Sequence, residues 1–176
     1  GVPDIGEFVA MVEEASIGTP YESLRLAKVW FQESNDTTTR EAAHSVPFVP
    51  HIDGARYLKI MVYINDVGIN DGPMHIASEP PARMEARRRQ FDENYKEQGR
   101  NQIRDVDPND LHPLTGSRGS AVIFDTNTPH TASQSHAGGI RRLVRFDFSC
   151  TRWDNTLLSY DAGWKRFANK IVRRNA

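Results

Sequence analysis

The chain has 176 residues, the length of one compact domain, so we expect residues 1–176 to form a single domain with one site. Its 22 Lys and Arg residues nearly balance 23 Asp and Glu residues, which argues against nucleic acid or an anionic membrane as a partner and favours small molecules. The single cysteine, Cys150, excludes an intramolecular disulfide framework and a cysteine-based zinc site. The sequence has no apolar run that could span a bilayer and no apolar export signal, so we expect a soluble, cytoplasmic protein.

The N-terminal part is predicted to be helical before the first strand. Residues 3–15 have helical periodicity, and a second short helix is expected over 21–27, which places N-terminal helices over about 3–27. Residues 28–32 are typical of a strand, whereas the polar stretch 33–43 lacks periodicity and is expected to be a loop. Two prolines then favour extended backbone just before His51-Ile-Asp53.

The clearest strand in the sequence covers residues 57–64, which are apolar on both alternating sets of positions. One set has the better packing surface and is expected to face a helical layer; it contains Leu58, Ile60, Val62 and Ile64. The other set is mixed and contains Tyr57, Lys59, Met61 and Tyr63. Of these, Lys59, Met61 and Tyr63 are expected to face the site.

The remaining segments alternate between turns and short elements. We expect a turn over 65–73, strands over 74–77, 120–124, 129–133 and 141–150, a charged helix over 82–98 and a terminal helix over 164–172. Many short strands with flanking helices favour a mainly β fold: a double-stranded β-helix, or jelly-roll barrel of the cupin-like kind. Its core is expected over about 28–150, followed by a C-terminal helical segment over about 151–176.

Two histidines and one aspartate form a candidate metal site. His51 and Asp53 are predicted at the start of a strand, where side chains two residues apart point the same way, and His130 follows on another strand. Two imidazoles and one carboxylate make up a facial triad, which binds Fe(II) and leaves positions open for a bidentate 2-oxo acid and dioxygen. Taken alone, the His-x-Asp triplet is a weak signal, because it recurs by chance.

A longer series of motifs resembles the phytanoyl-CoA dioxygenase family of Fe(II)- and 2-oxoglutarate-dependent oxygenases. The matching stretches, between about Val46 and Ser149, are His51-Ile-Asp53, Asn70-Asp-Gly-Pro73, Gly119-Ser-Ala-Val-Ile-Phe-Asp125, Pro129-His130 and Gly139-Ile-Arg141. The resemblance implies that His51, Asp53 and His130 bind the iron and that Arg141 pairs with the far carboxylate of 2-oxoglutarate. The planar fork of an arginine suits a carboxylate. Its neighbour Arg142 is expected on the opposite face of the strand.

The resemblance also implies an activity, with two departures from the family pattern. It implies a dioxygenase that uses Fe(II), 2-oxoglutarate and O2 to hydroxylate a small molecule, with release of succinate and CO2. Asp53 disfavours halogenation, because related halogenases carry Gly or Ala at this position. Met61 stands where many members have an aromatic residue, and Ala77-Ser-Glu79 replaces the usual Gly-Ser-His. The first change removes aromatic packing against the cosubstrate.

Several alternatives remain open from the sequence. The chain could be a cupin-like metal protein or enzyme that does not use 2-oxoglutarate, or a non-catalytic ligand-binding barrel; an inward Arg141 argues against both, because it would lack a counter-charge. Arg145 shares the face of Arg141, and either contacts an anionic substrate or pairs with Asp147. Trp30 is a second candidate for substrate contact. The run Arg87-Arg-Arg89 is interpreted as a solvated helix face.

Overall fold

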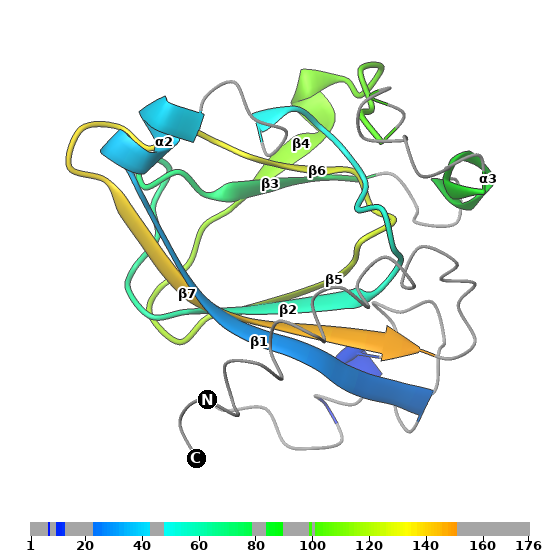
Figure 1. The fold of residues 1–176 in the computed structure, drawn as a ribbon. Coiled ribbons are helices and arrows are strands. Elements are labelled where there is room, and N and C mark those ends of the chain that lie inside the picture. The colour runs from blue at the N-terminus through cyan, green and yellow to red at the C-terminus, as the bar shows by residue number, and fades with distance from the viewer. Residues whose placement is uncertain are drawn as a thin grey trace, which may run out of the picture.

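The computed structural model describes residues 7, 10–12, 23–42, 48–78, 84–89, 99 and 101–150, and these are mainly β. A four-stranded antiparallel sheet contains, in spatial order, β1 (Leu24–Asn35), β7 (Ile140–Cys150), β2 (Leu58–Tyr63) and β5 (Ala121–Asp125). A three-stranded sheet contains β4 (Leu111–Leu114), β3 (Met74–Ala77) and β6 (His130–Ala132). The two sheets face each other across the interior (Figure 1), as the predicted jelly-roll barrel requires.

The helices with defined bounds in the described part of the chain are short. They are α2 (Asp36–Ala42), α3 (Glu85–Arg88) and the 3-10 helix η4 (Pro108–Asp110). Residues 7 and 10–12 of the predicted N-terminal helix are helical, and the rest of that helix lies outside the described residues. The same is true of residues 90–98 of the predicted charged helix and of the predicted helix over 164–172. Within the described part of the chain, no helix is both long and apolar enough to cross a membrane.

The alternation of β2 separates two of the three hydrophobic clusters of the described core. Leu58 and Ile60 pack with Val12, Leu24 and Cys150 on one face of the large sheet. Met61 and Tyr63 pack with Val67, Met74, Phe124 and Leu143 on the opposite face, between the two sheets. Leu58 and Leu143 are fully buried, and burying one such side chain contributes about 1.5–3 kcal/mol. The predicted difference between the two faces is therefore found for Leu58 and Ile60 against Met61 and Tyr63, whereas Ile64, at 37% exposure, lies outside the core.

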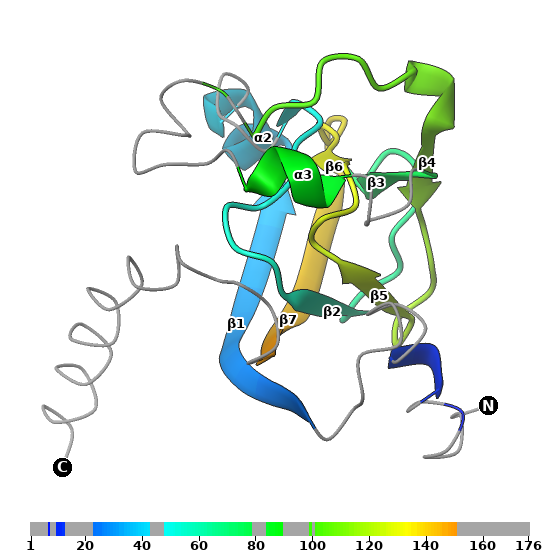
Figure 2. The same cartoon turned by 90° about the vertical axis from the view of Figure 1, so that its right-hand side faces the viewer.

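The first strand differs from the prediction. β1 begins at Leu24, where a helix over 21–27 was expected, and it runs antiparallel to β7 until Asn35 pairs with Ile140. In Figures 1 and 2 the two strands run side by side along the molecule. The register shifts between Leu26 and Lys28, so the side-chain alternation breaks there. Because the alternation breaks there, the hydrophobic pattern of the sequence does not reveal the whole strand. The long backbone pairing with β7 stabilises it.

A helix also replaces the expected loop after β1. The Oδ1 atom of Asn35 accepts hydrogen bonds from the Thr38 amide at 2.8 Å and from its hydroxyl at 3.0 Å, as an N-terminal helix cap does. Asp36 and Arg40 add an ion pair of 3.6 Å one turn apart. These local hydrogen bonds and the ion pair stabilise α2. The helix was not predicted because its sequence has little hydrophobic periodicity. The strand β4 was likewise missed, because Pro113 is typical of loops and is tolerated here only on an edge strand.

Candidate metal centre

The two histidines of the candidate site are brought together by backbone pairing. His51 forms an isolated antiparallel bridge with His130: its amide donates to the His130 carbonyl at 3.0 Å, and the His130 amide donates back at 2.9 Å. The sequence prediction placed His51 and Asp53 at the start of a strand, but β2 begins only at Leu58, so both lie on the loop before it. The site therefore needs the pairing with β6 to form.

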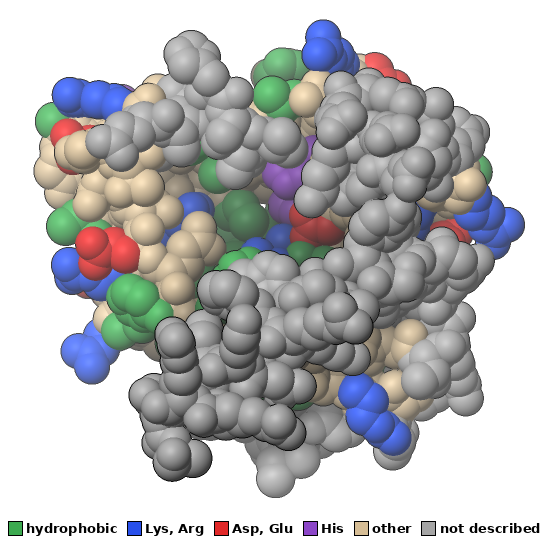
Figure 3. Space-filling view, viewed as in Figure 1, with side chains coloured by type: hydrophobic (Ala, Val, Ile, Leu, Met, Phe, Trp, Pro, Cys, Tyr) green, Lys and Arg blue, Asp and Glu red, His purple; other side chains and the backbone are tan. Residues whose placement is uncertain are grey.

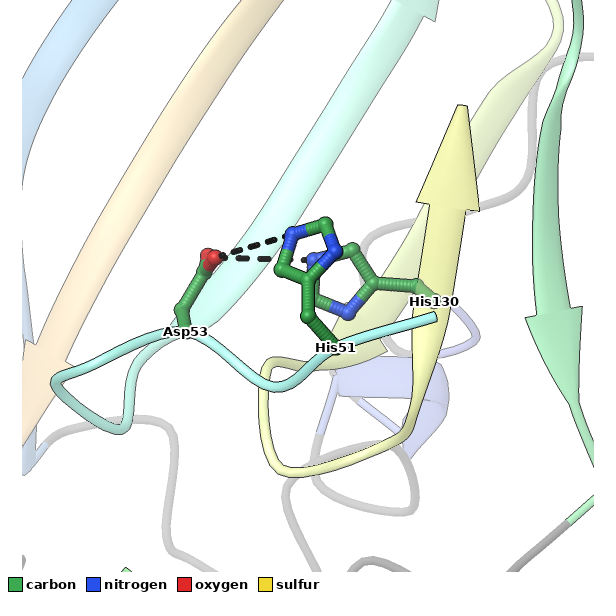
Figure 4. Close-up of side chains that lie close together, drawn as sticks. All are labelled: His51, Asp53 and His130. Atoms are coloured by element: carbon green, nitrogen blue, oxygen red, sulfur yellow. Dashed lines mark ion pairs between the residues drawn. The ribbon is translucent and has the colours of Figure 1, made fainter. Parts of the chain in front are cut away.

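The ligand atoms of His51, Asp53 and His130 all lie within 4.8 Å of one another. The Oδ1 atom of Asp53 is 3.8 Å from Nε2 of His51 and 3.6 Å from Nε2 of His130, and the three side chains point toward a common centre (Figure 4). Ligand atoms bound about 2.1 Å from one metal ion lie roughly 3–3.5 Å apart. Small side-chain movements would therefore suffice to coordinate an ion.

Both imidazoles are fixed in the tautomer that binds a metal. Nδ1 of His51 lies 2.7 Å from the Val49 carbonyl oxygen, and Nδ1 of His130 lies 2.8 Å from the Thr128 carbonyl oxygen. A carbonyl oxygen can only accept, so each Nδ1 carries the proton and donates it. Each Nε2 then presents its lone pair to the centre of the triad, which is the arrangement of a metal-binding histidine.

The charges of the three side chains also suit a divalent cation. Burial lowers the pKa of His130 to about 4, with the charge of Lys59 acting in the same direction. Burial likewise lowers the pKa of His51. Burial alone would raise the pKa of Asp53, but chiefly the charge of Lys59 holds it well below its usual range. At neutral pH the donor set is therefore two neutral imidazoles and one carboxylate, which fits Fe(II).

The second carboxylate oxygen of Asp53 is bonded away from the centre. Oδ2 accepts a hydrogen bond from the Tyr57 hydroxyl and forms an ion pair of 2.9 Å with Lys59 Nζ. Lys59 Nζ is also 3.3 Å from His130 Nε2 and is buried, so the predicted site-facing lysine lies beside the triad. Met61 and Tyr63 continue its face of β2 away from the triad.

Arg141 lies inside the barrel and Arg142 outside it, as the alternation predicted. Arg141 is 5% exposed; its Nη2 donates to Ser34 Oγ at 3.5 Å, and among the described residues its Nε has no hydrogen-bond partner. Within the part of the chain that the structure describes, no carboxylate forms an ion pair with it. Burial lowers the pKa of Arg141, and the nearby Tyr63 opposes that effect. Arg142 instead forms an exposed ion pair of 2.6 Å with Glu33.

Of the two roles left open for Arg145, the structure has the ion pair. Arg145 donates to Asp147 from Nε at 2.6 Å and from Nη2 at 3.1 Å. Its guanidinium lies 4.8 Å from the ring centroid of Trp30, which is opposite it in the β1–β7 register. Trp30 is 43% exposed, so it remains open to a ligand.

Two residues of the site were not predicted. Arg88, assigned from sequence to a solvated face, is buried, and it donates to the Asp53 carbonyl oxygen and to Asn127 Oδ1. The sequence alone does not indicate which of three consecutive arginines points inward. The contact between α3 and the loop of Asp53 shows that Arg88 does. Tyr57 could have been found, because it follows the same alternation as Lys59.

The candidate centre is accessible from one side of the molecule. Figure 3 shows histidine and acidic side chains at the floor of a hollow, with basic and hydrophobic side chains beside them. The side chains of His51 and Asp53 are 12% and 21% exposed, and that of His130 is 3% exposed. A small molecule could therefore approach the triad from the side of His51 and Asp53.

Known proteins match this chain in structure and not in sequence. A scan against protein-family models finds no match, and a search of curated proteins finds none either. EvdO2 from Micromonospora carbonacea var. aurantiaca, solved with 2-oxoglutarate, matches with a TM-score of 0.54 and 19% identity over 84% of this chain and 61% of its own. The apo form of ThoJ, a non-heme monooxygenase, matches with a TM-score of 0.55 and 12% identity over 84% and 54%.

SnoN, a non-heme alpha-ketoglutarate-dependent epimerase from nogalamycin biosynthesis, matches with a TM-score of 0.50 and 17% identity over 83% of this chain and 53% of its own. The chain thus spans between about half and three fifths of the length of these proteins. At such low identities the likeness establishes a fold. The fold is the jelly-roll barrel, which the chain shares with these proteins.

Proposed function

We propose that this protein is a non-haem Fe(II)- and 2-oxoglutarate-dependent dioxygenase of the phytanoyl-CoA dioxygenase type. His51, Asp53 and His130 would hold the Fe(II), and the reaction would hydroxylate a small-molecule substrate with release of succinate and CO2. Bound iron would supply the activation of O2, coupled to oxidative decarboxylation of the 2-oxo acid. Asp53 supports hydroxylation over halogenation, because related halogenases lack this carboxylate.

The observation that carries the proposal is the buried guanidinium of Arg141. A buried arginine without a carboxylate partner costs several kcal/mol, so its retention points to an anionic ligand that completes it. It lies inside the same barrel as a triad that leaves coordination positions free. A molecule with a 2-oxo acid at one end and a carboxylate at the other satisfies both requirements, and 2-oxoglutarate has that form.

Other residues of the interior support the same cosubstrate. Lys59 lies beside the triad and would attract the metal-bound carboxylate, while Tyr63 lies close enough to Arg141 for each to affect the other's pKa. Met61 lies between Lys59 and Tyr63 on the same face of β2. This face would form the wall along which 2-oxoglutarate extends from the metal to Arg141.

Trp30 is the proposed contact for the primary substrate. It is half-exposed and packs on Arg145, which in turn reaches Tyr57 beside Asp53. Because Arg145 is already neutralised by Asp147, we propose that it orients Trp30 rather than binding a free anion. Succinate formation, screened over a panel of metabolites, would identify the substrate.

Anaerobic titration tests the use of 2-oxoglutarate. Fe(II) is first added to metal-free protein and then 2-oxoglutarate, and we expect a weak visible charge-transfer band when the 2-oxo acid chelates the metal. Succinate in place of 2-oxoglutarate is the control, because it has both carboxylates but no 2-oxo group, and it should give no band. A colourless mixture with demonstrably bound iron would instead favour a metal protein that does not use 2-oxoglutarate.

A further inference from the structure

We infer that Tyr57 is a positioning residue of the metal centre, which holds the outer oxygen of Asp53 so that the carboxylate offers only Oδ1 to the metal. The inference rests on the metal-binding part of the proposed function and on no assumption about the cosubstrate. It concerns a residue outside the three ligands. Its basis is a hydrogen-bonded chain that reaches from β7 to the loop carrying Asp53.

The two oxygens of Asp53 have different surroundings. Oδ1 faces the two imidazoles and lies 3.6 Å and 3.8 Å from the two Nε2 atoms that would bind the metal. Oδ2 accepts from the Tyr57 hydroxyl and pairs with Lys59 Nζ at 2.9 Å. The carboxylate thus has one oxygen that faces the two imidazoles and one that is bonded away from them.

The direction of the hydrogen bonds is fixed by chemistry. Arg145 Nη2 donates to the hydroxyl oxygen of Tyr57, and a guanidinium has no acceptor atom. The hydroxyl proton of Tyr57 is therefore directed to Oδ2 of Asp53. The two hydrogen bonds therefore point the same way: the guanidinium donates to the hydroxyl, and the hydroxyl donates to the carboxylate.

The far end of the chain is anchored independently of the metal. Asp147 holds Arg145 by two hydrogen bonds, of 2.6 Å and 3.1 Å, and Trp30 covers the guanidinium. Arg145 and Asp147 both lie on β7, which pairs with β2, and Tyr57 directly precedes β2. Tyr57 therefore transfers the rigidity of the sheet to a ligand that lies on a loop.

The rigid ring of Tyr57 suits this role better than Lys59 does. The lysine has a flexible four-carbon stem and can follow the carboxylate if it turns. Without the Tyr57 hydroxyl, Asp53 could rotate and bind the metal through both oxygens. That change would fill one of the coordination positions that the proposed cosubstrate and dioxygen need.

The test is Tyr57→Phe, with metal binding as the readout. Anaerobic Fe(II) affinity would be measured by chelator competition, and Co(II) would report the coordination number through its ligand-field absorption. Loss of an outer hydrogen bond to a metal ligand costs about 10–100-fold in affinity, and we expect a loss in that range. We also expect a changed Co(II) spectrum, which a purely structural role of Tyr57 would not produce.

Ser133→Ala is the control. It removes another hydroxyl, half-buried, which donates to the Pro73 carbonyl oxygen at 2.7 Å and belongs neither to the triad nor to the proposed cosubstrate wall. Its Fe(II) affinity and Co(II) spectrum should equal those of the wild type. An equal loss in both variants would overturn the inference, because it would show a general effect of removing a hydroxyl from the interior.

A double-mutant cycle tests whether Arg145 acts through Tyr57. Arg145→Met should weaken Fe(II) binding less than Tyr57→Phe does, and the double variant should resemble Tyr57→Phe alone, because both changes act on one carboxylate oxygen. Additive losses would contradict the inference that Arg145 acts through Tyr57. A Tyr57→Phe variant with wild-type affinity and spectrum would contradict the positioning role of Tyr57 itself. If the wild-type protein binds neither Fe(II) nor Co(II), the proposed function fails as well.

Discussion

The two ends of the barrel interior are built differently. At the triad, each ligand has its second polar atom bonded: the histidines to the carbonyls of Val49 and Thr128, and Asp53 to Tyr57 and Lys59. At Arg141, the guanidinium is buried; among the described residues its Nε has no hydrogen-bond partner, and its Nη2 has a long contact of 3.5 Å to Ser34. Within the described part of the chain, the triad has its supporting hydrogen bonds, whereas Arg141 has no charged partner.

This difference between the triad and Arg141 indicates which kind of ligand each region can bind. A side chain with fixed tautomer and orientation is preorganised for a group of constant geometry, such as a metal ion. A buried charge without a partner is costly, and a ligand that brings the opposite charge removes that cost on binding. We therefore propose that the metal end holds a resident ion while the Arg141 end receives a cosubstrate that is consumed.

The largest effect is expected at the metal end. Asp53→Ala removes one of the three proposed ligands, so its Fe(II) affinity should fall by more than the roughly hundredfold limit for outer contacts. The variant should stay folded at neutral pH, because Asp53 belongs to the site and to none of the three hydrophobic clusters. Calorimetric titration and circular dichroism measure the two properties. Asp107→Ala, at an exposed cap, is the control, and global unfolding of Asp53→Ala would favour a structural role for the residue.

The next largest effect is expected at the other end. Truncating one partner of a buried charge pair costs about 2–5 kcal/mol, so Arg141→Ala should lower the apparent affinity for 2-oxoglutarate by roughly thirtyfold or more. Its Fe(II) affinity should be unchanged, because the ligands of the metal are untouched. Succinate formation against 2-oxoglutarate concentration measures the effect.

Arg142→Ala is the matched control for the cosubstrate end. Its side chain is exposed and pairs with Glu33 on the outer face, so cosubstrate affinity should remain near that of the wild type. The contrast between the two ends would disappear if both arginine variants behaved alike, and the proposed strand register would be wrong if Arg142→Ala were the weaker binder.

A smaller effect should appear behind the metal end. Arg88→Met removes the hydrogen bonds to the Asp53 carbonyl and to Asn127, and it leaves buried acceptors unpaired. We expect the free energy of unfolding to fall by about 1–3 kcal/mol, with a weaker Fe(II) affinity as well. Urea denaturation measures the first. The neighbouring Arg89 is exposed, so Arg89→Met should change stability by at most about 0.5 kcal/mol, and equal effects would contradict the buried role of Arg88.

The smallest effect concerns the metal-free protein in acid. The pKa of His130 is lowered to about 4 in the folded state by burial and by Lys59, with Asp53 opposing and His51 adding to the shift. The unfolded chain, with a histidine pKa near 6.5, then binds more protons between those values, so stability falls as the pH decreases through that window. From pH 7 to pH 5.5 we expect a loss of about 1 kcal/mol from this residue, measurable by urea denaturation. His130→Gln should reduce this pH dependence, and an unchanged dependence would contradict the buried neutral histidine.

The sequence predicted the fold class and the triad because both depend on features that can be recognised in short stretches of sequence. Alternating apolar positions in residues 57–64 and the strand of Arg141 are set by local geometry, and they gave the correct inward and outward faces. The ligand types are chemically distinctive, so His51, Asp53 and His130 could be selected by spacing and resemblance. The N-terminal cap of α2, Asn35, is also a local sequence signal, but an analysis of hydrophobic periodicity alone does not detect it.

What the tertiary structure alone decided depends on contacts between distant segments. The register shift in β1 is stabilised by pairing with β7, and His51 reaches its position through a backbone bridge to His130. The same holds for Arg88, which looks like its solvated neighbours until α3 packs against the loop of Asp53. The sequence by itself thus determined which groups can bind a metal, because that follows from side-chain chemistry. Only the fold decided how they are held, because orientation depends on hydrogen bonds between residues far apart in the chain.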